Sequence, residues 1–475
     1  MQLGFHENGF ETQPAQRLVG VYVRWTLWYL LAVAIVWALG FEGIYYHPTP
    51  FYGLLRPEFD LTAVPWHLLA VGVFLAGFAL WRHRLRKMDW FEGAWSSKTV
   101  RFFVLGLMVF AILFPAALAS VREGPSGIVA PYERHRDEYI GDIGKGLSIR
   151  GFFRDYIKMH PHLSMHSKVH PPGPAALLWL FSMIVFSQEA FPLAIMTIVF
   201  GATALIPLYF WAKDMTGSRV ALTACSLYVV VPTIVLFTAT SADILFMPFT
   251  LTTLFLFWRA LHRPSIPYAL GAGFTYALMS LLSFSLVGIG AFFAFMGLWR
   301  LGQKGNRRAV FQTAALMLAT FVLTHLVVWW WSGFDVIACF QICKAQFDTD
   351  QANLDLITPR FPWWSWKILN PLCWLYFAGI PVSVLFLRRV LKPEADTRTL
   401  FLIFGATLVV LDVLYLARGE GERSAMYIIP FLVIPAAHVL DCIGRRTHSI
   451  APLAATVCFM AAQCWLTEVM LYTYW

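Results

Sequence analysis

Tyr132–Pro174 reads YERHRDEYIGDIGKGLSIRGFFRDYIKMHPHLSMHSKVHPPGP, and the apolar run Pro174–Ser187 continues it as PAALLWLFSMIVFS. The first stretch gathers acids, arginines, lysines and histidines within an otherwise apolar chain. The length of the second stretch decides the predicted topology. Its fourteen residues would reach only about 21 Å as a helix, which is short of a hydrocarbon core of about 30 Å. We therefore expect Pro174–Ser187 to lie at the membrane interface without crossing.

The composition predicts an all-α polytopic membrane protein. The chain has 475 residues, of which 59% are hydrophobic and 13% charged, whereas soluble domains carry about 25% charged residues. Apolar runs of about 20 residues recur along the chain, as expected of membrane-spanning helices. The formal charge of +9 is explained by basic loops beside these spans. Because no basic helix or RNA-binding motif is present, we expect the bilayer and no nucleic acid as a partner.

The loops predict about thirteen spans, with the N-terminus inside and the C-terminus outside. If Pro174–Ser187 stays on the outer face, every short basic loop faces the cytoplasm, as the positive-inside rule requires. The expected spans are Trp25–Tyr46, Leu61–Trp81, Phe102–Val121, Phe191–Trp211, Val220–Thr238, Leu245–Leu261, Tyr268–Leu286, Gly288–Trp299, Ala309–Trp331, Ile368–Leu387, Leu400–Ala417, Ala425–Asp441 and Ile450–Leu471.

We expect one membrane-embedded domain over residues 1–475. Within it, residues 1–101 form an additional N-terminal helical hairpin with a basic cytoplasmic loop. Residues 121–190 form the first large outer segment, which carries the interfacial helix. Residues 332–367 form a second outer segment. The chain is thus expected to be a multi-pass protein, and its polar outer segments are the places to look for chemistry.

Acidic residues in two outer segments are candidates for that chemistry. Asp137 and Glu138 are adjacent, Asp142 follows about one helical turn later, and Asp243 lies in the outer turn before the span Leu245–Leu261. A carboxylate beside the membrane is costly unless it is paired or functional. Two alternatives in which these acids have only a structural role stay open. The loop acids can pair with neighbouring arginines or lysines, and Asp243 can serve as the N-cap of its span.

Cationic side chains in the same outer segment suit a phosphate or pyrophosphate at the membrane surface. Attraction to lipid headgroups is the alternative, and a histidine metal site is a weaker one. The HPPGP sequence stiffens the entry to the interfacial helix and is expected to hold His170 at the membrane edge. The candidate cations are Arg150, Arg154, His166, Lys168 and His170.

These features together resemble the GT-C glycosyltransferases, which include the protein O-mannosyltransferases and the lipid A aminoarabinose transferases. The resemblance rests on the acidic pair in the first large outer loop, the His-Pro-Pro entry to an interfacial helix, and the acid in the next outer turn. It is best over Asp137–Asp243. A weaker similarity links GEGERSAMYIIPFLVIP, Gly419–Pro435, to the late Arg–Tyr–Pro segment of that family. The chain departs from the family in placing Tyr139 directly after the acidic pair, and His170 where the lipid A enzymes have lysine.

The resemblance implies transfer of a sugar from a polyprenyl-phosphate donor to an acceptor hydroxyl on a glycan, lipid or protein. Asp137 is expected to be the base, with Glu138 as the alternative. Asp243 would orient the acceptor, or join Asp137 on a divalent cation such as Mg²⁺ or Mn²⁺. One displacement predicts inversion at the anomeric carbon. The expected substrate-binding residues are Asp142, Arg150, Arg154, His166, Lys168, His170, Arg423 and Tyr427.

The expected location is the plasma (inner) membrane, with the site on the extracytoplasmic face. Nucleotide sugars are expected on the cytoplasmic side, so an outward-facing transferase needs a donor delivered through the bilayer. The alternative function is a multi-span transporter or flippase of lipids or solutes. Such a protein would show midplane charges, broken helices and paired halves. The sequence instead concentrates its charges in one outer loop.

Overall fold

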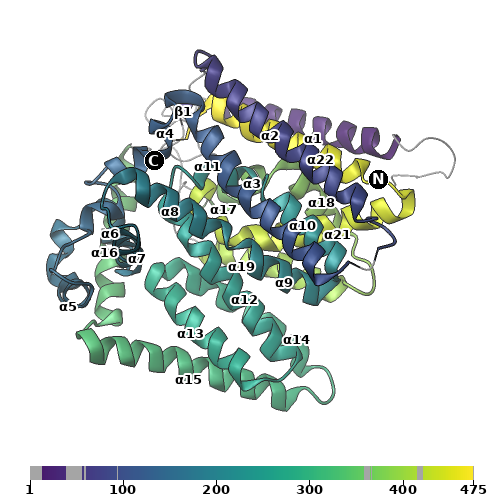
Figure 1. The fold of residues 1–475 in the computed structure, drawn as a ribbon. Helices are drawn as coiled ribbons and strands as arrows, with labels where there is room; N and C mark the ends of the chain where they lie inside the picture. Colours follow the sequence, from purple (N-terminus) through teal and green to yellow (C-terminus); the bar gives the residue numbers. More distant parts are fainter. Residues whose placement is uncertain are drawn as a thin grey trace.

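A computed structural model describes residues 13–38, 56–57, 60–93, 95–357, 364, 366–414 and 421–473. These residues are almost entirely helical (Figure 1). The elements of the first half are α1 Gln13–Ala38, β1 Arg56–Pro57, α2 Val64–Lys87, α3 Ser97–Glu123, α4 Ser126–Glu133, η2 Tyr139–Asp142, α5 Ile149–Met159, η3 His160–His162, α6 Met165–Val169, α7 Gly173–Ile184, α8 Ala190–Ala202, α9 Leu205–Thr216, α10 Ser218–Tyr228 and α11 Pro232–Phe237.

The second half continues as a helical array and ends in a strand. Its elements are η4 Ala242–Leu245, α12 Phe246–His262, α13 Ile266–Leu282, η5 Phe284–Ile289, α14 Gly290–Leu301, α15 Arg307–Ser332, α16 Val336–Ile357, α17 Trp366–Phe377, α18 Ile380–Leu391, α19 Arg398–Leu414, α20 Gly421–Ser424, η7 Met426–Ile428, α21 Ile429–Thr447, α22 Ala451–Met470 and β2 Leu471–Tyr472.

Eight helical segments within the described residues are long and apolar enough to cross a membrane. The number rises to nine if α17 and α18, which meet at a bend of 114°, form one span. The thirteen expected spans are therefore not reproduced. The expected span Val220–Thr238, for example, divides into α10 and α11 at the break before Pro232. Proline supplies no backbone N–H and cannot continue an existing helix. Residues 39–46 of the first expected span lie outside the described residues.

The core and the periphery differ in the way expected for a bundle surrounded by lipid. The segment Met426–Thr447 is almost wholly buried, whereas Val64–Lys87 and Arg307–Ser332 are largely exposed. Their exposed side chains include large apolar ones, such as Leu68 and Trp330. Backbone groups in hydrocarbon must be satisfied internally, and helices do this wherever they face lipid. The all-helical multi-pass class predicted from composition is confirmed.

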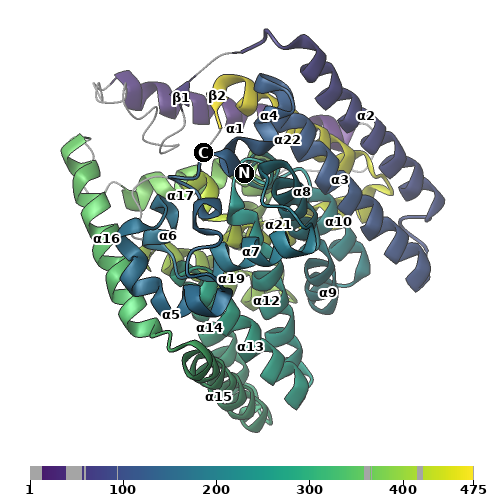
Figure 2. The same cartoon turned by 60° about the vertical axis from the view of Figure 1, so that its left-hand side comes forward.

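The helix after the double proline is as short as its sequence predicts. α7 covers 12 residues, about 18 Å at 1.5 Å per residue, and one of its faces is buried, including Leu178 and Trp179. It packs against α8, α13, α5 and η2. Its location at the membrane interface stays a prediction. Figure 2 shows α5 and α6 beside α16, so the two outer segments predicted from the sequence contact each other.

A short strand pair joins the segment before α2 to the C-terminal part of the chain. β1 pairs antiparallel with β2, with Arg56 opposite Tyr472. The Arg122 guanidinium donates hydrogen bonds to backbone carbonyls of Glu468 and Leu471 at 2.9 and 2.8 Å. These contacts connect the α2–α3 hairpin to the end of α22. They hold the end of α3, where the outer segment between α3 and α7 begins.

Candidate active site

The acidic pair precedes η2 and contacts the first turn of α6. Glu138 is buried, and its Oε2 lies 3.0 Å from Nδ1 of His166, within ion-pair distance. Asp137 is half-buried, and its backbone carbonyl accepts from the amide of His166 at 3.0 Å. Thus both acids fix His166, one through its side chain and the other through its backbone. The second carboxylate oxygen of Glu138, Oε1, is buried without a hydrogen-bond partner among the described residues.

The polar loop is held together by Asp142, which is fully buried. Its carboxylate accepts from the backbone amide of Ser164 at 3.1 Å, the hydroxyl of Ser164 at 2.7 Å and Nζ of Lys145 at 2.6 Å. Ser164 is also the N-cap of α6 and accepts from the amide of Ser167. Asp142 therefore connects the end of η2 to the start of α6, the helix that carries His166.

We expect Asp142→Ala to destabilise this loop by about 2 kcal/mol, because buried donors lose their acceptor. The midpoint of thermal unfolding of the purified protein, followed by fluorescence, should fall by a few degrees. Asp155→Ala is the matched control. Asp155 pairs with the exposed Arg154, and exposed pairs contribute little. Equal shifts for the two variants would show that Asp142 has no special role.

The HPPGP sequence brings His170 close to the acidic pair. Gly173 is required at the start of α7, because a Cβ at this position would lie 2.1 Å from the carbonyl oxygen of Leu281. The His170 ring lies 5.8 Å from the ring of Tyr139 in an edge-to-face arrangement. Burial lowers the pKa of His170 to about 4, although the charge of Asp243 opposes the shift. His170 is therefore neutral near pH 7, and its Nδ1 lacks a partner among the described residues.

The second acid joins the site through an arginine from late in the chain. The N-cap of η4, the turn that leads into α12, is Ser241, whose side chain accepts from the amide of Asp243 at 3.1 Å. The Asp243 carboxylate instead faces Arg423 of α20, with Nε 3.4 Å from Oδ2. Nη2 of Arg423 lies 3.5 Å from Nε2 of His166. The capping role that the sequence allowed for Asp243 is thus performed by Ser241.

Glu138, His166, Arg423 and Asp243 form one buried polar array, which we call the site array. It joins four segments that are far apart in the sequence. Arginine only donates, so the contact with Arg423 makes Nε2 of His166 the acceptor and assigns the ring proton to Nδ1, facing Glu138. Burial acts to lower the pKa of His166, but the charge and hydrogen bond of Glu138 outweigh it, so this pKa is raised.

Tyr132 is a component that the sequence reasoning missed. It is buried, and burial raises its pKa, with the negative charges of Glu138 and Asp243 acting in the same direction. Tyr132 therefore lies within electrostatic range of both acids, and its phenol stays protonated. Its position at the start of the polar stretch was visible in the sequence, but nothing in the pattern separated it from an interfacial aromatic residue.

The other predicted site residues lie around the site array or away from it. Arg150 and Arg154 are exposed on α5, and Arg154 pairs with Asp155. Lys168 is half-buried on α6, and its carbonyl oxygen lies 2.8 Å from Nε2 of His160. Tyr427 is buried in η7. Among the described residues, no hydrogen bond or ion pair joins these four side chains to the array, and their roles stay predictions.

The metal site predicted at Asp137 and Asp243 stays a prediction. Arg423 places a positive charge beside the Asp243 carboxylate. Among the described residues, the only group of three side chains close enough to hold a metal ion is Glu394, His438 and Cys442, which includes neither acid.

Comparison with solved structures shows the class of this fold. A crystal structure of the Archaeoglobus fulgidus oligosaccharyltransferase with Zn and sulfate matches with a TM-score of 0.51 at 16% identity, covering 77% of this chain and 53% of that one. AglB from the same organism, in complex with an inhibitory peptide and a dolichol-phosphate, matches with a TM-score of 0.51 at 15% identity, covering 78% and 56%. The chain thus spans about half the length of these proteins and shares their fold over that part.

A family model supports the same assignment from the sequence. Residues 169–331, about a third of the chain, match the family of dolichyl-phosphate-mannose-protein mannosyltransferases. No curated protein sequence matches. The matched segment includes His170 and Asp243, whereas Glu138, His166 and Arg423 lie outside it. This match over part of the chain agrees with the resemblance of its motifs to the GT-C glycosyltransferases.

Proposed function

We propose that the chain transfers a hexose from a polyprenyl phosphate to an acceptor hydroxyl, with inversion, at the site array. The observation that carries this proposal is the buried contact chain from Glu138 through His166 and Arg423 to Asp243. It joins two acids to cations in one place. Mannose is the first sugar to test, because the matching family is described by a mannosyl donor.

The base is proposed to be a carboxylate of the Asp137–Glu138 pair, and the contacts favour Glu138. Its Oε1 is a buried acceptor without a protein partner among the described residues. Buried polar groups without partners are rare, and an acceptor hydroxyl would satisfy this one. The hydroxyl oxygen attacks the anomeric carbon and Glu138 takes its proton. The carbon–oxygen bond to phosphate breaks, and polyprenyl phosphate leaves with the electron pair.

The leaving phosphate is proposed to face Arg423, His170 and Lys168. Arg423 is buried and charged, so it can stabilise negative charge in a site that excludes water. Neutral His170 would act as a hydrogen-bond donor and not as a second cation. The half-buried Lys168 lies two residues before it. Asp243 holds the Arg423 guanidinium in position and can orient the acceptor. A phosphate leaving group requires no general acid.

The distribution of charge supports an extracytoplasmic site. α12 begins beside Asp243 and ends near Arg259 and Arg263, and the segment Met426–Thr447 begins near Arg423 and ends at Arg445 and Arg446. Basic residues favour the cytoplasmic ends of spans. The site array lies at the opposite ends of both helices. Because nucleotide sugars are cytoplasmic, a donor at this end must be carried on a lipid.

The donor class is tested with membranes that contain the full-length chain. Labelled mannose on polyprenyl phosphate should move from the lipid-extractable donor to endogenous acceptors, whereas nucleotide-linked mannose should give no product when polyprenol carriers are absent. Asp243→Asn should abolish most of the transfer, and Glu92→Gln, at an exposed position after α2, should leave it unchanged. Direct use of the nucleotide sugar would refute the proposal.

A further inference from the structure

A basic cavity of about 690 Å³ lies between the C-terminal ends of α18 and α21. It is at the other end of the bundle from the site array: in Figure 1, α5–α7 lie at the left and α18 at the right. The charged side chains that line it are Arg388, Arg389, Lys392, Glu394 and Arg446. Four cations and one carboxylate give this cavity a positive field that attracts anions.

Arg389 distinguishes this cavity from an ordinary basic loop. Its side chain is only 3% exposed, unlike the solvated cations that set membrane topology. Glu394 pairs with its Nη1 at 3.0 Å, and its Nη2 donates to Oγ1 of Thr397 at 2.6 Å and lies 3.1 Å from Nδ1 of His438. Nε is buried without a partner among the described residues. A buried guanidinium with an unused donor needs an explanation, and a bound anion provides one.

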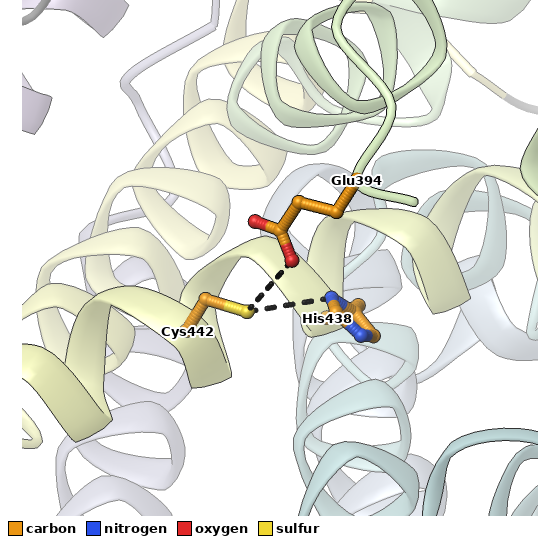
Figure 3. A group of neighbouring side chains, drawn as sticks. All are labelled: Glu394, His438 and Cys442. Atoms are coloured by element: carbon orange, nitrogen blue, oxygen red, sulfur yellow. Dashed lines mark hydrogen bonds between the residues drawn. The ribbon is translucent and has the colours of Figure 1, made fainter. Parts of the chain in front are cut away.

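A metal ion is the alternative ligand for this region. Figure 3 shows Glu394, His438 and Cys442 together, with the Cys442 thiol 4.0 Å from Oε2 of Glu394 and 3.5 Å from Nδ1 of His438. The Arg389 guanidinium, however, contacts both Glu394 and His438. A divalent cation would have to lie beside this buried positive charge. The electrostatics therefore favour an anion.

We propose that this cavity binds a phosphate-bearing anion, held by Arg389 and by the more exposed Lys392 and Arg446. Guanidinium and ammonium groups at the end of membrane helices are the groups that recognise phosphate headgroups. The same chemistry serves the headgroup of an anionic lipid and a free phosphate. This site is independent of the proposed transfer reaction, so the two proposals can be tested separately.

The test uses the full-length protein and does not depend on its activity. Native mass spectrometry from nanodiscs would count phosphatidic acid retained per chain in a phosphatidylcholine background, and thermal shift would measure stabilisation by inorganic phosphate. We expect Lys392→Gln/Arg446→Gln to weaken anion binding about tenfold or more, since hydrogen bonds to charged groups are lost. The matched control is Lys304→Gln/Arg308→Gln, which removes the same charge from exposed positions of another basic loop.

The two measurements, lipid retention and stabilisation by phosphate, distinguish a lipid headgroup from a soluble phosphate ligand. Retention of phosphatidic acid that only the Lys392/Arg446 variant loses supports a lipid headgroup site, and stabilisation by phosphate alone supports a soluble ligand. Equal losses in both double variants would overturn the proposal, because binding would then be general attraction to a basic surface. Stoichiometric Zn²⁺ binding that is lost in Cys442→Ser would also overturn it, in favour of a metal site.

Discussion

Arg423→Gln is expected to lower the transfer rate from the lipid-linked donor by about 10²–10³-fold, because it removes a buried charge beside the developing phosphate anion. Arg423 contacts both Asp243 and His166, so its loss affects both halves of the site array. Arg423→Lys should recover only part of the rate, since an ammonium group cannot reproduce the planar guanidinium fork. Initial rates at saturating donor give the comparison, and Arg263→Gln is an exposed control.

A structural explanation of that loss is separable from a chemical one. Arg423→Gln leaves the Asp243 carboxylate buried beside fewer positive charges, and unpaired buried charges are strongly destabilising. Adding Asp243→Asn removes this charge, so the double variant should regain thermal stability relative to Arg423→Gln while the transfer rate stays low. If the double variant recovered the rate as well, Arg423 would serve folding and the phosphate would be bound elsewhere.

The helical class was predictable from the sequence, because it depends on local composition. Apolar runs identify membrane helices directly. The short run after the double proline predicted a helix too short to cross, and α7 is such a helix. The number of spans was not predictable, since a count by apolar length treats Val220–Thr238 as continuous. The break between α10 and α11 depends on Pro232 and on how neighbouring helices pack.

The structure brings together four of the residues selected from the sequence, in an arrangement that the sequence could not predict. Sequence reasoning selected Glu138, His166, Asp243 and Arg423, yet it could not rank Glu138 against Asp137, because adjacent residues differ only in the direction of their side chains. That direction is set by the bonds at Arg134 and His166. Sequence reasoning could not predict the pairing of Arg423 with Asp243, which are 180 residues apart, since no local pattern encodes such a contact. The structural role of Asp142 was hidden for the same reason.

The acid that removes the acceptor proton is the member of the site whose replacement should have the largest effect. Glu138→Gln is expected to lower the transfer rate by about 10²–10⁴-fold, the usual contribution of a general base. Glutamine keeps the length of the side chain and an oxygen that can accept from Nδ1 of His166, so the fold should be preserved. Glu133→Gln, at an exposed position of the same segment, is the control for charge.

Asp137→Asn separates the two candidate bases. Asp137 holds His166 through its backbone carbonyl, a contact that the amide substitution leaves in place, so we expect less than about a tenfold loss if Glu138 is the base. If Asp137→Asn caused the larger loss of rate and Glu138→Gln the smaller one, Asp137 would be the base. The Glu138 carboxylate would then serve only to position His166, through Oε2.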